Sequence, residues 1–157
     1  MKILITGITG TLGQEVTRQL LSNHKDIDIV GFSRDEYKQS KFPFKGNRRV
    51  SLVLGDVRDE VVLLKAAAKC SHILHFASLK HVDLGEDHVD EFIKTIIHGT
   101  INVALCTRFF KTKVVLASTD KAVMPINVYG NCKAIAEKLV LNESRINAVV
   151  RYGNVLN

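Results

Sequence analysis

The sequence contains no tryptophan, two prolines and three cysteines in 157 residues, and aromatic residues make up 6% of it. Cys70, Cys106 and Cys132 lack paired spacing and clustered histidines, which argues against a zinc site or a secreted disulfide framework and favours a reducing cytoplasm. No apolar run approaches the roughly 20 residues of a membrane span, and the N-terminus shows no signal-peptide pattern. We therefore expect an unexported, cytoplasmic protein with no membrane association and no metal.

Basic residues outnumber acidic ones by 22 to 16, which gives a net charge of +6 and a pI near 9.3. Such a balance suits an anionic partner, either nucleic acid or a phosphate-bearing small molecule. The basic residues are scattered, and the one dense patch, Lys45 with Arg48 and Arg49, is short. We interpret that patch as solvated surface and expect no nucleic-acid partner.

Short apolar runs alternate with longer segments of helical periodicity, and this order predicts a parallel sheet with crossover helices in one domain over residues 1–157. The predicted strands are 2–6, 27–32, 50–54, 72–76, 113–117 and 148–152. The predicted helices are 11–22, 59–68, 90–110 and 128–142, and residues 35–45 and 79–88 are predicted loops with room for short helical turns. We expect an α/β fold, a Rossmann-type doubly wound parallel sheet with helices on both faces, truncated before a substrate lobe. Without covering helices, its last strand is expected to expose an apolar edge that favours self-association.

A glycine-rich turn joins the first strand to the first helix. Gly7 permits a tight turn, Gly10 allows a pyrophosphate to approach the backbone, and Gly13 allows the helix to pack closely on the strand. The helix N-terminus then presents N–H groups to the anion, with Thr9, Thr11 and Leu12 completing the predicted site. The G-x-x-G-x-x-G spacing resembles that of the short-chain dehydrogenase/reductase superfamily, and it predicts a nicotinamide dinucleotide cofactor.

The residues after the second strand predict which dinucleotide binds. Ser33 and Arg34 stand where a carboxylate would hydrogen-bond the ribose of NAD, and a guanidinium suits the 2′-phosphate of NADP. Lys38 adds a second cation, while the adjacent Asp35 keeps NAD possible. After the third strand, Asp56 and Val57 are expected to bracket the adenine, although Asp56 equally fits a helix cap.

Tyr129 and Lys133 are four residues apart, which places both side chains on one face of a helix. A neighbouring ammonium is expected to lower the pKa of the phenol, so that Tyr129 can act as a general base. Thr119 ends the preceding strand and supplies a hydroxyl to the same place, while Lys133 would also hold the nicotinamide ribose. The combination again resembles the short-chain dehydrogenases/reductases.

Six longer motifs carry more specific information: SRDE from 33, GDVRD from 55, LKHV from 79, STDKA from 118, PINVYG from 125 and VRYGNV from 150. Together they resemble one branch of the extended short-chain dehydrogenases/reductases, the inverting UDP-N-acetylglucosamine 4,6-dehydratases of the polysaccharide biosynthesis protein family. The match runs over essentially the whole chain but only about the N-terminal half of such an enzyme. Its sharpest element is Thr119-Asp120-Lys121, because an epimerase would be expected to have small or hydroxyl residues there.

The resemblance implies a role for each of these side chains. Tyr129 would take the proton of the sugar 4-hydroxyl while hydride passes from carbon 4 to the nicotinamide. Lys121 would abstract the proton on carbon 5 as an amine, and Asp120, protonated, would assist loss of the 6-hydroxyl as water. Return of the hydride to carbon 6 leaves NADP unconsumed. The resemblance further implies a UDP-sugar substrate, cofactor contacts from Ala77 and Ser78, and substrate contacts from Lys80, His81 and Asn154.

Two features depart from the family pattern. Ile96 stands where the family has asparagine after a threonine, which puts a proton relay through that position in doubt. The chain also ends at Asn157 without the residues that would hold the UDP-sugar, so we expect a homo-oligomer or a completing chain. Three alternatives stay open: a catalytically silent NADP-binding module, another extended short-chain dehydrogenase such as a nucleotide-sugar epimerase, and an interaction domain that uses the basic surface.

Overall fold

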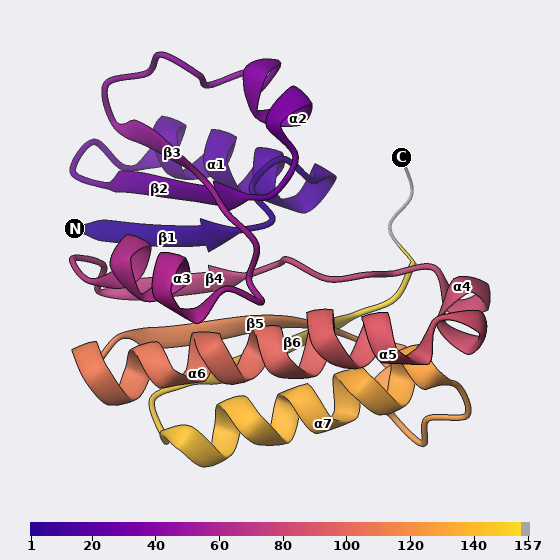
Figure 1. The fold of residues 1–157 in the computed structure, drawn as a ribbon. Helices are drawn as coiled ribbons and strands as arrows, with labels where there is room; N and C mark the ends of the chain where they lie inside the picture. The colour runs from indigo at the N-terminus through magenta and orange to yellow at the C-terminus, as the bar shows by residue number, and fades with distance from the viewer. Residues whose placement is uncertain (155–157) are drawn as a thin grey trace.

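The computed structural model describes residues 1–154 of the chain and places six parallel strands in one sheet (Figure 1). The strand order is β3-β2-β1-β4-β5-β6, so the chain moves outward from β1 in one direction and then crosses to the other side. This crossing places the carboxyl ends of β1 and β4 side by side, which is the usual ligand position in an open α/β sheet. The strands are β1 Lys2–Thr6, β2 Asp28–Ser33, β3 Val50–Leu54, β4 His72–His75, β5 Lys113–Thr119 and β6 Ala148–Tyr152.

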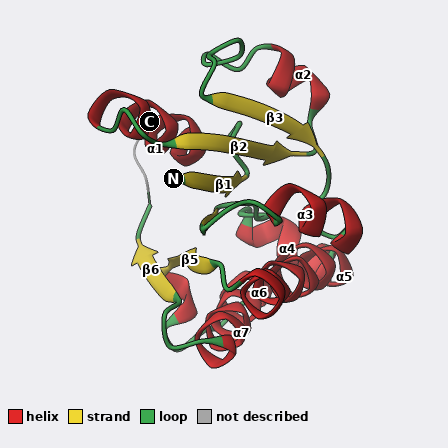
Figure 2. Ribbon diagram, turned by 90° about the vertical axis from the view of Figure 1, so that its left-hand side faces the viewer, coloured by secondary structure: helices red, strands yellow, loops and turns green. Residues whose placement is uncertain are grey.

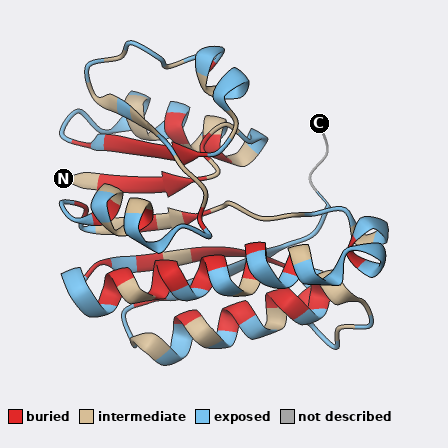
Figure 3. Cartoon of the chain, viewed as in Figure 1, coloured by how far each residue is buried: buried red, intermediate tan, exposed pale blue. Residues whose placement is uncertain are grey.

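Helices cover both faces of the sheet, as expected for a doubly wound fold (Figure 2). On one face, α1 (Thr11–Asn23) packs its apolar side on Ile3, Ile5 and Ile29. On the other, helices α3 (Glu60–Ala67), α6 (Gly99–Phe110) and α7 (Val128–Glu143) enclose a larger core that includes Leu4 and Leu116. Adjacent residues of β1 therefore face opposite sides of the sheet, and Figure 3 shows β1 and β2 buried over most of their length.

Polar side chains cap the N-termini of several helices. Asp59 accepts a hydrogen bond from the N–H of Val62 at the start of α3, and Asn127 does the same for Gly130 in α7. Such caps satisfy N–H groups that have no partner within the helix. Within the described residues, no helix has the length and apolar character that crossing a membrane requires.

The predicted helix over 90–110 is wrong in one respect, because the structure divides it into three. α5 (Val89–Phe92) leads into a π-helical segment, η1 (Ile93–His98), and only then into α6. A π-helix inserts an extra residue per turn, which apolar periodicity does not reveal. At the junction Gly99 lies against Val57, where a Cβ would come within 2.8 Å of the valine Cγ2.

Other boundaries shift by a few residues. Phe76 lies outside β4, and β5 continues through Ser118 and Thr119, so that both residues remain paired with β6. The two predicted loops contain α2 (Glu36–Ser40) and α4 (Val82–Asp87), and a short 3-10 turn, η2 (Asp120–Ala122), follows β5.

The strand β6 lies at one edge of the sheet in the described part of the chain. As expected, it exposes apolar side chains, with Val150 53% and Tyr152 40% accessible. Self-association through this edge stays a prediction. Val155, the last residue of the sixth motif, lies outside the described residues.

Candidate functional site

The glycine-rich turn connects β1 to α1 and is held by hydrogen bonds from its backbone N–H groups. Gly7 adopts a left-handed conformation with φ of +69° and donates its N–H to Phe32 O at 2.8 Å. Gly10 donates to Gly7 O at 3.0 Å and occupies the cap position of α1. No side chain caps this helix and its first turn has no acidic residue, so its N-terminal charge is not compensated there.

Two of the glycines are required by close approach. A Cβ on Gly7 would lie 2.8 Å from the backbone nitrogen of Ala77, at the end of β4. A Cβ on Gly13 would lie 2.6 Å from Gly7 O and from the Cα and O of Ile8, so the helix packs directly on the turn. The predicted roles of Gly7 in the turn and of Gly13 in helix packing are therefore confirmed in this geometry, while the approach of a pyrophosphate to Gly10 stays a prediction.

A buried histidine links this turn to β4. Thr6 Oγ1 accepts from the N–H groups of Phe76 and Ala77 at 3.2 Å each, and it shares a 2.7 Å hydrogen bond with His75 Nδ1. Because the hydroxyl must donate to the ring, Nε2 carries the proton and donates to Thr100 Oγ1 at 3.3 Å. Burial lowers the pKa of His75 to about 3, so the ring is neutral near physiological pH. Its role is to hold β1, β4 and α6 together.

The ends of β2 and β3 carry the residues predicted to select the cofactor. Arg34 is 53% exposed, and its guanidinium lies 3.6 Å from Asp56, which also accepts from Arg58 at 2.7 Å. Burial opposes ionisation of Asp56, but the hydrogen bonds from Arg58 outweigh it and lower the pKa of Asp56. Lys38 pairs with Asp35 at 3.6 Å on the surface.

Gln39 is a residue that sequence reasoning missed at this place. Its side-chain amide donates to Ser33 O, Ser33 Oγ and Val53 O at 2.9 to 3.0 Å, so it fixes the ends of both strands. A glutamine in a predicted loop gives no signal for such a role. Farther along, Asn102 of α6 donates to Val57 O at 2.9 Å and anchors the loop predicted to bracket the adenine.

Tyr129 and Lys133 lie on α7 as predicted, but the predicted lowering of the phenol pKa by the ammonium is wrong. Lys133 donates its Nζ to Ala117 O at 2.9 Å instead. Burial and then the nearby Tyr152 raise the pKa of Tyr129, while the Thr119 hydroxyl acts in the opposite direction. Burial also lowers the pKa of Lys133 to about 8, so the ammonium itself is held near its titration point.

Asp120 and Lys121 form an ion pair directly after β5, and their predicted catalytic roles stay predictions. Thr119 Oγ1 donates to Asp120 Oδ1 at 2.9 Å, and Lys121 Nζ donates to the same oxygen at 3.2 Å and to Asn154 Oδ1 at 3.1 Å. The hydrogen bonds from Thr119 and Lys121 lower the pKa of Asp120. These donors favour the carboxylate of Asp120 in the absence of a substrate, and its protonation during the reaction stays a prediction.

Two residues from the segment before α6 position Tyr129 and were not found from the sequence. The ring of Phe92 meets that of Tyr129 edge-on, with centroids 6.5 Å apart at 84°. Glu86 of α4 accepts from the N–H of Val128 at 2.8 Å, the first residue of α7. Ile96 is 1% exposed and packs in the core, so the position expected to hold asparagine has an apolar structural role here.

The remaining predicted contacts lie between the end of β4 and the start of α4. Ala77 donates to Thr6 at the turn, whereas Ser78 donates to Leu79 O at 2.7 Å. Lys80 and His81 are exposed at the start of α4, and their contact with a substrate stays a prediction.

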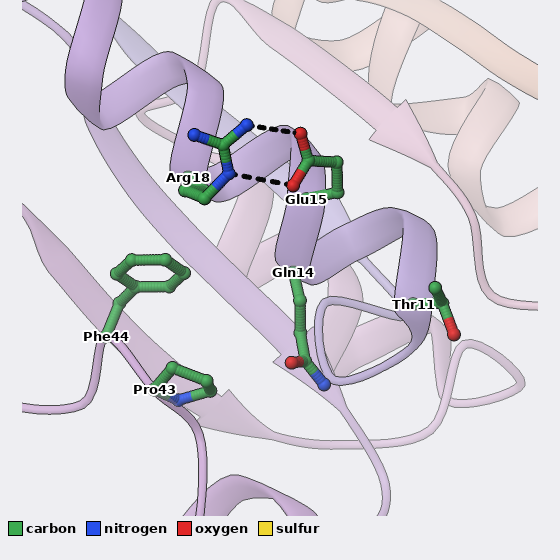
Figure 4. Close-up of a pocket in the computed structure, with 6 residues that line it drawn as sticks. All are labelled: Thr11, Gln14, Glu15, Arg18, Pro43 and Phe44. Atoms are coloured by element: carbon green, nitrogen blue, oxygen red, sulfur yellow. Dashed lines mark hydrogen bonds and ion pairs between the residues drawn. The ribbon is translucent and has the colours of Figure 1, made fainter. Parts of the chain in front are cut away.

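A hollow of about 410 Å³ lies beside the turn, on the outer side of α1 (Figure 4). It is lined by Thr11, Gln14, Glu15, Arg18, Pro43 and Phe44, which include none of the predicted catalytic residues. Figure 4 shows Arg18 and Glu15 joined by two hydrogen bonds, with Phe44 and Pro43 across the hollow. The hollow borders the predicted phosphate site through Thr11 alone.

Within the basic patch, Arg49 has a structural role, and the three cysteines are packed inside the fold. Arg49 donates to His24 O and to Leu21 O, and so satisfies carbonyls at the end of α1. All three cysteines are free and buried, and burial raises their pKa values, that of Cys106 to about 12. Across residues 1–154, no group of three or more histidine, cysteine, aspartate or glutamate residues is placed to hold a metal ion.

The parallel sheet, its glycine turn and the paired Tyr129 and Lys133 define the class of protein. It is a Rossmann-type domain of the extended short-chain dehydrogenase/reductase class. More particularly, the chain belongs to the polysaccharide biosynthesis protein family, whose family model matches residues 3–157.

Two curated relatives and one solved structure are similar to this chain over nearly its whole length. The inverting UDP-N-acetylglucosamine 4,6-dehydratase of Campylobacter jejuni is 39% identical over 163 residues, covering 98% of this chain and 49% of that protein. The UDP-glucose 4-epimerase of Rickettsia bellii is 40% identical over 166 residues, with the same coverage of each. The solved structure of Pen from Bacillus thuringiensis superposes with a TM-score of 0.92 at 32% identity, covering 99% of this chain and 52% of that one. The chain spans about half the length of the curated relatives it matches.

Proposed function

We propose that the chain binds a nicotinamide dinucleotide and forms the catalytic half of a nucleotide-sugar 4,6-dehydratase of the inverting type, acting on UDP-N-acetylglucosamine. The residues fit the cofactor at the glycine turn. The neighbouring backbone leaves no room for a Cβ at Gly7 or Gly13, and no side chain caps the N-terminus of α1. The Campylobacter relative carries this activity in its description. Residues 1–157 would then be one dinucleotide-binding domain.

NADP is the form that we propose, with NAD as the alternative. Arg34 lies at the end of β2, is 53% exposed and pairs with Asp56 at 3.6 Å, a distance typical of a loose ion pair. A 2′-phosphate would compete for this planar guanidinium, which can donate two parallel hydrogen bonds to phosphate oxygens. Lys133 would hold the nicotinamide ribose, and Asp56 with Val57 the adenine.

When bound, the nicotinamide ring supplies a reversible acceptor for hydride. Tyr129 would take the proton of the sugar 4-hydroxyl, since its ring is held between Phe92 and the end of β5. The raised pKa of Tyr129 favours its protonated form, so proton removal requires a neighbouring positive charge.

Asp120 and Lys121 would perform the elimination as a pair. One proton transferred along the 3.2 Å hydrogen bond from Lys121 Nζ to Asp120 Oδ1 gives a neutral amine and a carboxylic acid. The amine can then abstract the proton on carbon 5, and the acid can protonate the departing 6-hydroxyl. A bound sugar that excludes water would favour this neutral pair over the ion pair, because burial penalises both charges.

The observation that carries the proposal is the Asp120–Lys121–Asn154 group at the end of β5, because an acid and a base beside Tyr129 are what elimination needs beyond oxidation. The second candidate is a nucleotide-sugar epimerase, which the Rickettsia relative favours. An epimerase needs the oxidation but no acid–base pair for the loss of water.

Two measurements test the proposal. Calorimetry of the chain with NADP and NAD tests cofactor binding, and a ligand at 100 times its Kd should stabilise the fold by about 2.7 kcal/mol. Incubating UDP-N-acetylglucosamine with the chain, alone and supplemented with the C-terminal half of the Campylobacter relative, tests the chemistry. A dehydratase gives a 4-keto product that has lost one water, whereas an isomer of unchanged mass supports the epimerase. Absence of dinucleotide binding at millimolar concentration would refute both.

A further inference from the structure

Glu137 is a buried carboxylate of α7 that the proposed chemistry does not use. Its side chain is 7% exposed and accepts hydrogen bonds from Ser118 Oγ at 2.5 Å, Arg151 Nε at 2.9 Å and Arg151 Nη2 at 2.5 Å. The bonds from Arg151 lower the pKa of Glu137 although burial opposes ionisation. A buried charge is costly unless it is paired and hydrogen-bonded, and Glu137 meets both conditions.

The contacts of Glu137 fix how α7 lies on β5. Lys133 donates to Ala117 O at 2.9 Å, and the next strand residue, Ser118, donates to Glu137. Tyr129 lies against the following strand residue, Thr119, whose hydroxyl acts to lower the pKa of Tyr129. Residues 129, 133 and 137 are spaced by four, so they share one face of the helix. Three successive strand residues thus meet three turns of this face.

Glu137 lies one helical turn after Lys133 on the same face of α7, so its carboxylate is the acidic group of that face next to Lys133. Lys133 is 4% exposed, and burial lowers its pKa to about 8 while Glu137 acts in the opposite direction. From β4, His75 faces the same region as a neutral ring, and from α7 itself Tyr129 lies one turn away. From β6, Arg151 binds the carboxylate of Glu137.

We propose that Glu137 is a positioning residue, which holds α7 in register with β5 and provides the countercharge of Lys133 within the Tyr129–Lys133 pair. Ser118 and Arg151 hold Glu137 in place from the two neighbouring strands. The catalytic meaning of this arrangement rests on the proposed function. The contact itself can be tested in the chain without any cofactor.

The test compares two substitutions on the same helix. Glu137→Gln keeps the shape of the side chain and removes its charge. The control, Glu143→Gln, removes a similar Arg–carboxylate pair at the last residue of α7, where Arg108 donates to Glu143 at 3.0 and 2.9 Å. The readout is the titration of Lys133 followed by NMR of ¹³C-labelled lysine and assigned with Lys133→Met.

In Glu137→Gln, the Lys133 midpoint should fall by about one pH unit, because a nearby opposite charge has been removed. The ring signals of Tyr129 should shift as well, and Glu143→Gln should leave both unchanged. A purely structural carboxylate predicts the opposite direction, since loosened packing admits water and raises the midpoint toward 10.5. An unchanged or raised midpoint in Glu137→Gln, or an equal fall in both variants, would overturn the proposal.

Arg151→Gln gives an independent test should Glu137→Gln fail to fold, because the Arg151 side chain is 50% exposed. Removing this cation leaves the charge of Glu137 unpaired near Lys133, so the midpoint should rise, whereas the matched change Arg108→Gln should leave it unchanged. An unchanged midpoint in Arg151→Gln, or an equal rise in both variants, would contradict the countercharge. Failure of the proposed function can be distinguished from failure of the role proposed for Glu137. Absence of dinucleotide binding with the expected Lys133 shifts refutes the proposed function alone, whereas binding without those shifts refutes the role of Glu137.

Discussion

Stability should fall as pH drops below 6.5, chiefly because of one fully buried side chain, His75. The histidine is completely buried between Thr6 and Thr100, and burial lowers its pKa from 6.5 to about 3. The unfolded chain therefore binds a proton at mildly acidic pH that the folded chain does not. Stabilisation by the neutral ring is complete above pH 6.5 and is lost as pH falls toward 3.

The size of the effect follows from the shift. Each pH unit between the two pKa values costs about 1.4 kcal/mol of unfolding free energy. At pH 5 the loss relative to pH 7 should be about 2 kcal/mol, and below pH 3 about 5 kcal/mol. Carboxylates titrate in the lower part of that range, so pH 5 to 7 isolates the histidine best.

Urea denaturation at pH 7, 6 and 5 measures this loss in the wild-type chain, in His75→Asn and in the control His88→Gln, which removes an exposed histidine. His75→Asn should be less stable at pH 7 by about 1–3 kcal/mol, because Thr6 or Thr100 loses a buried partner. Its stability should nevertheless change less between pH 7 and 5 than that of the wild type, because only His72, whose pKa burial also lowers, still contributes. Equal slopes in wild type and His75→Asn, or titration of the His75 ring signals above pH 5, would refute the reasoning.

Three further outcomes are expected. Gly13→Ala should lower the unfolding free energy by about 1–3 kcal/mol in urea denaturation, because its Cβ would lie 2.6 Å from Gly7 O and Ile8; unchanged stability would show that the helix can move away. Arg34→Asp should shift the ratio of calorimetric affinities from NADP toward NAD, and a constant ratio would mean that Arg34 does not contact the 2′-phosphate. Lys121→Ala, in a chain completed with a relative's second half, should abolish exchange at carbon 5 in deuterated water and leave dinucleotide affinity intact. Equal loss of both would contradict its role as the base.

Much of the fold and of the site follows from local sequence patterns. Buried parallel strands are continuous apolar runs, and each predicted strand is present within a few residues. The glycine spacing predicts the β1–α1 turn because positive φ and close backbone approach leave glycine as the residue that fits. The four-residue spacing of Tyr129 and Lys133 likewise determines a shared helix face wherever that helix lies.

Only the tertiary structure decided the electrostatics and the supporting contacts. Burial is a property of the packed chain, and it raised the pKa of Tyr129, whereas donors from neighbouring residues lowered that of Asp120. Glu137 meets Ser118 and Arg151 across 19 and 14 residues of sequence, and no periodicity connects such positions. The sequence thus determined which chemical groups the sheet presents at its carboxyl edge. Their charge states and partners depended on distances that arise once the strands and helices pack.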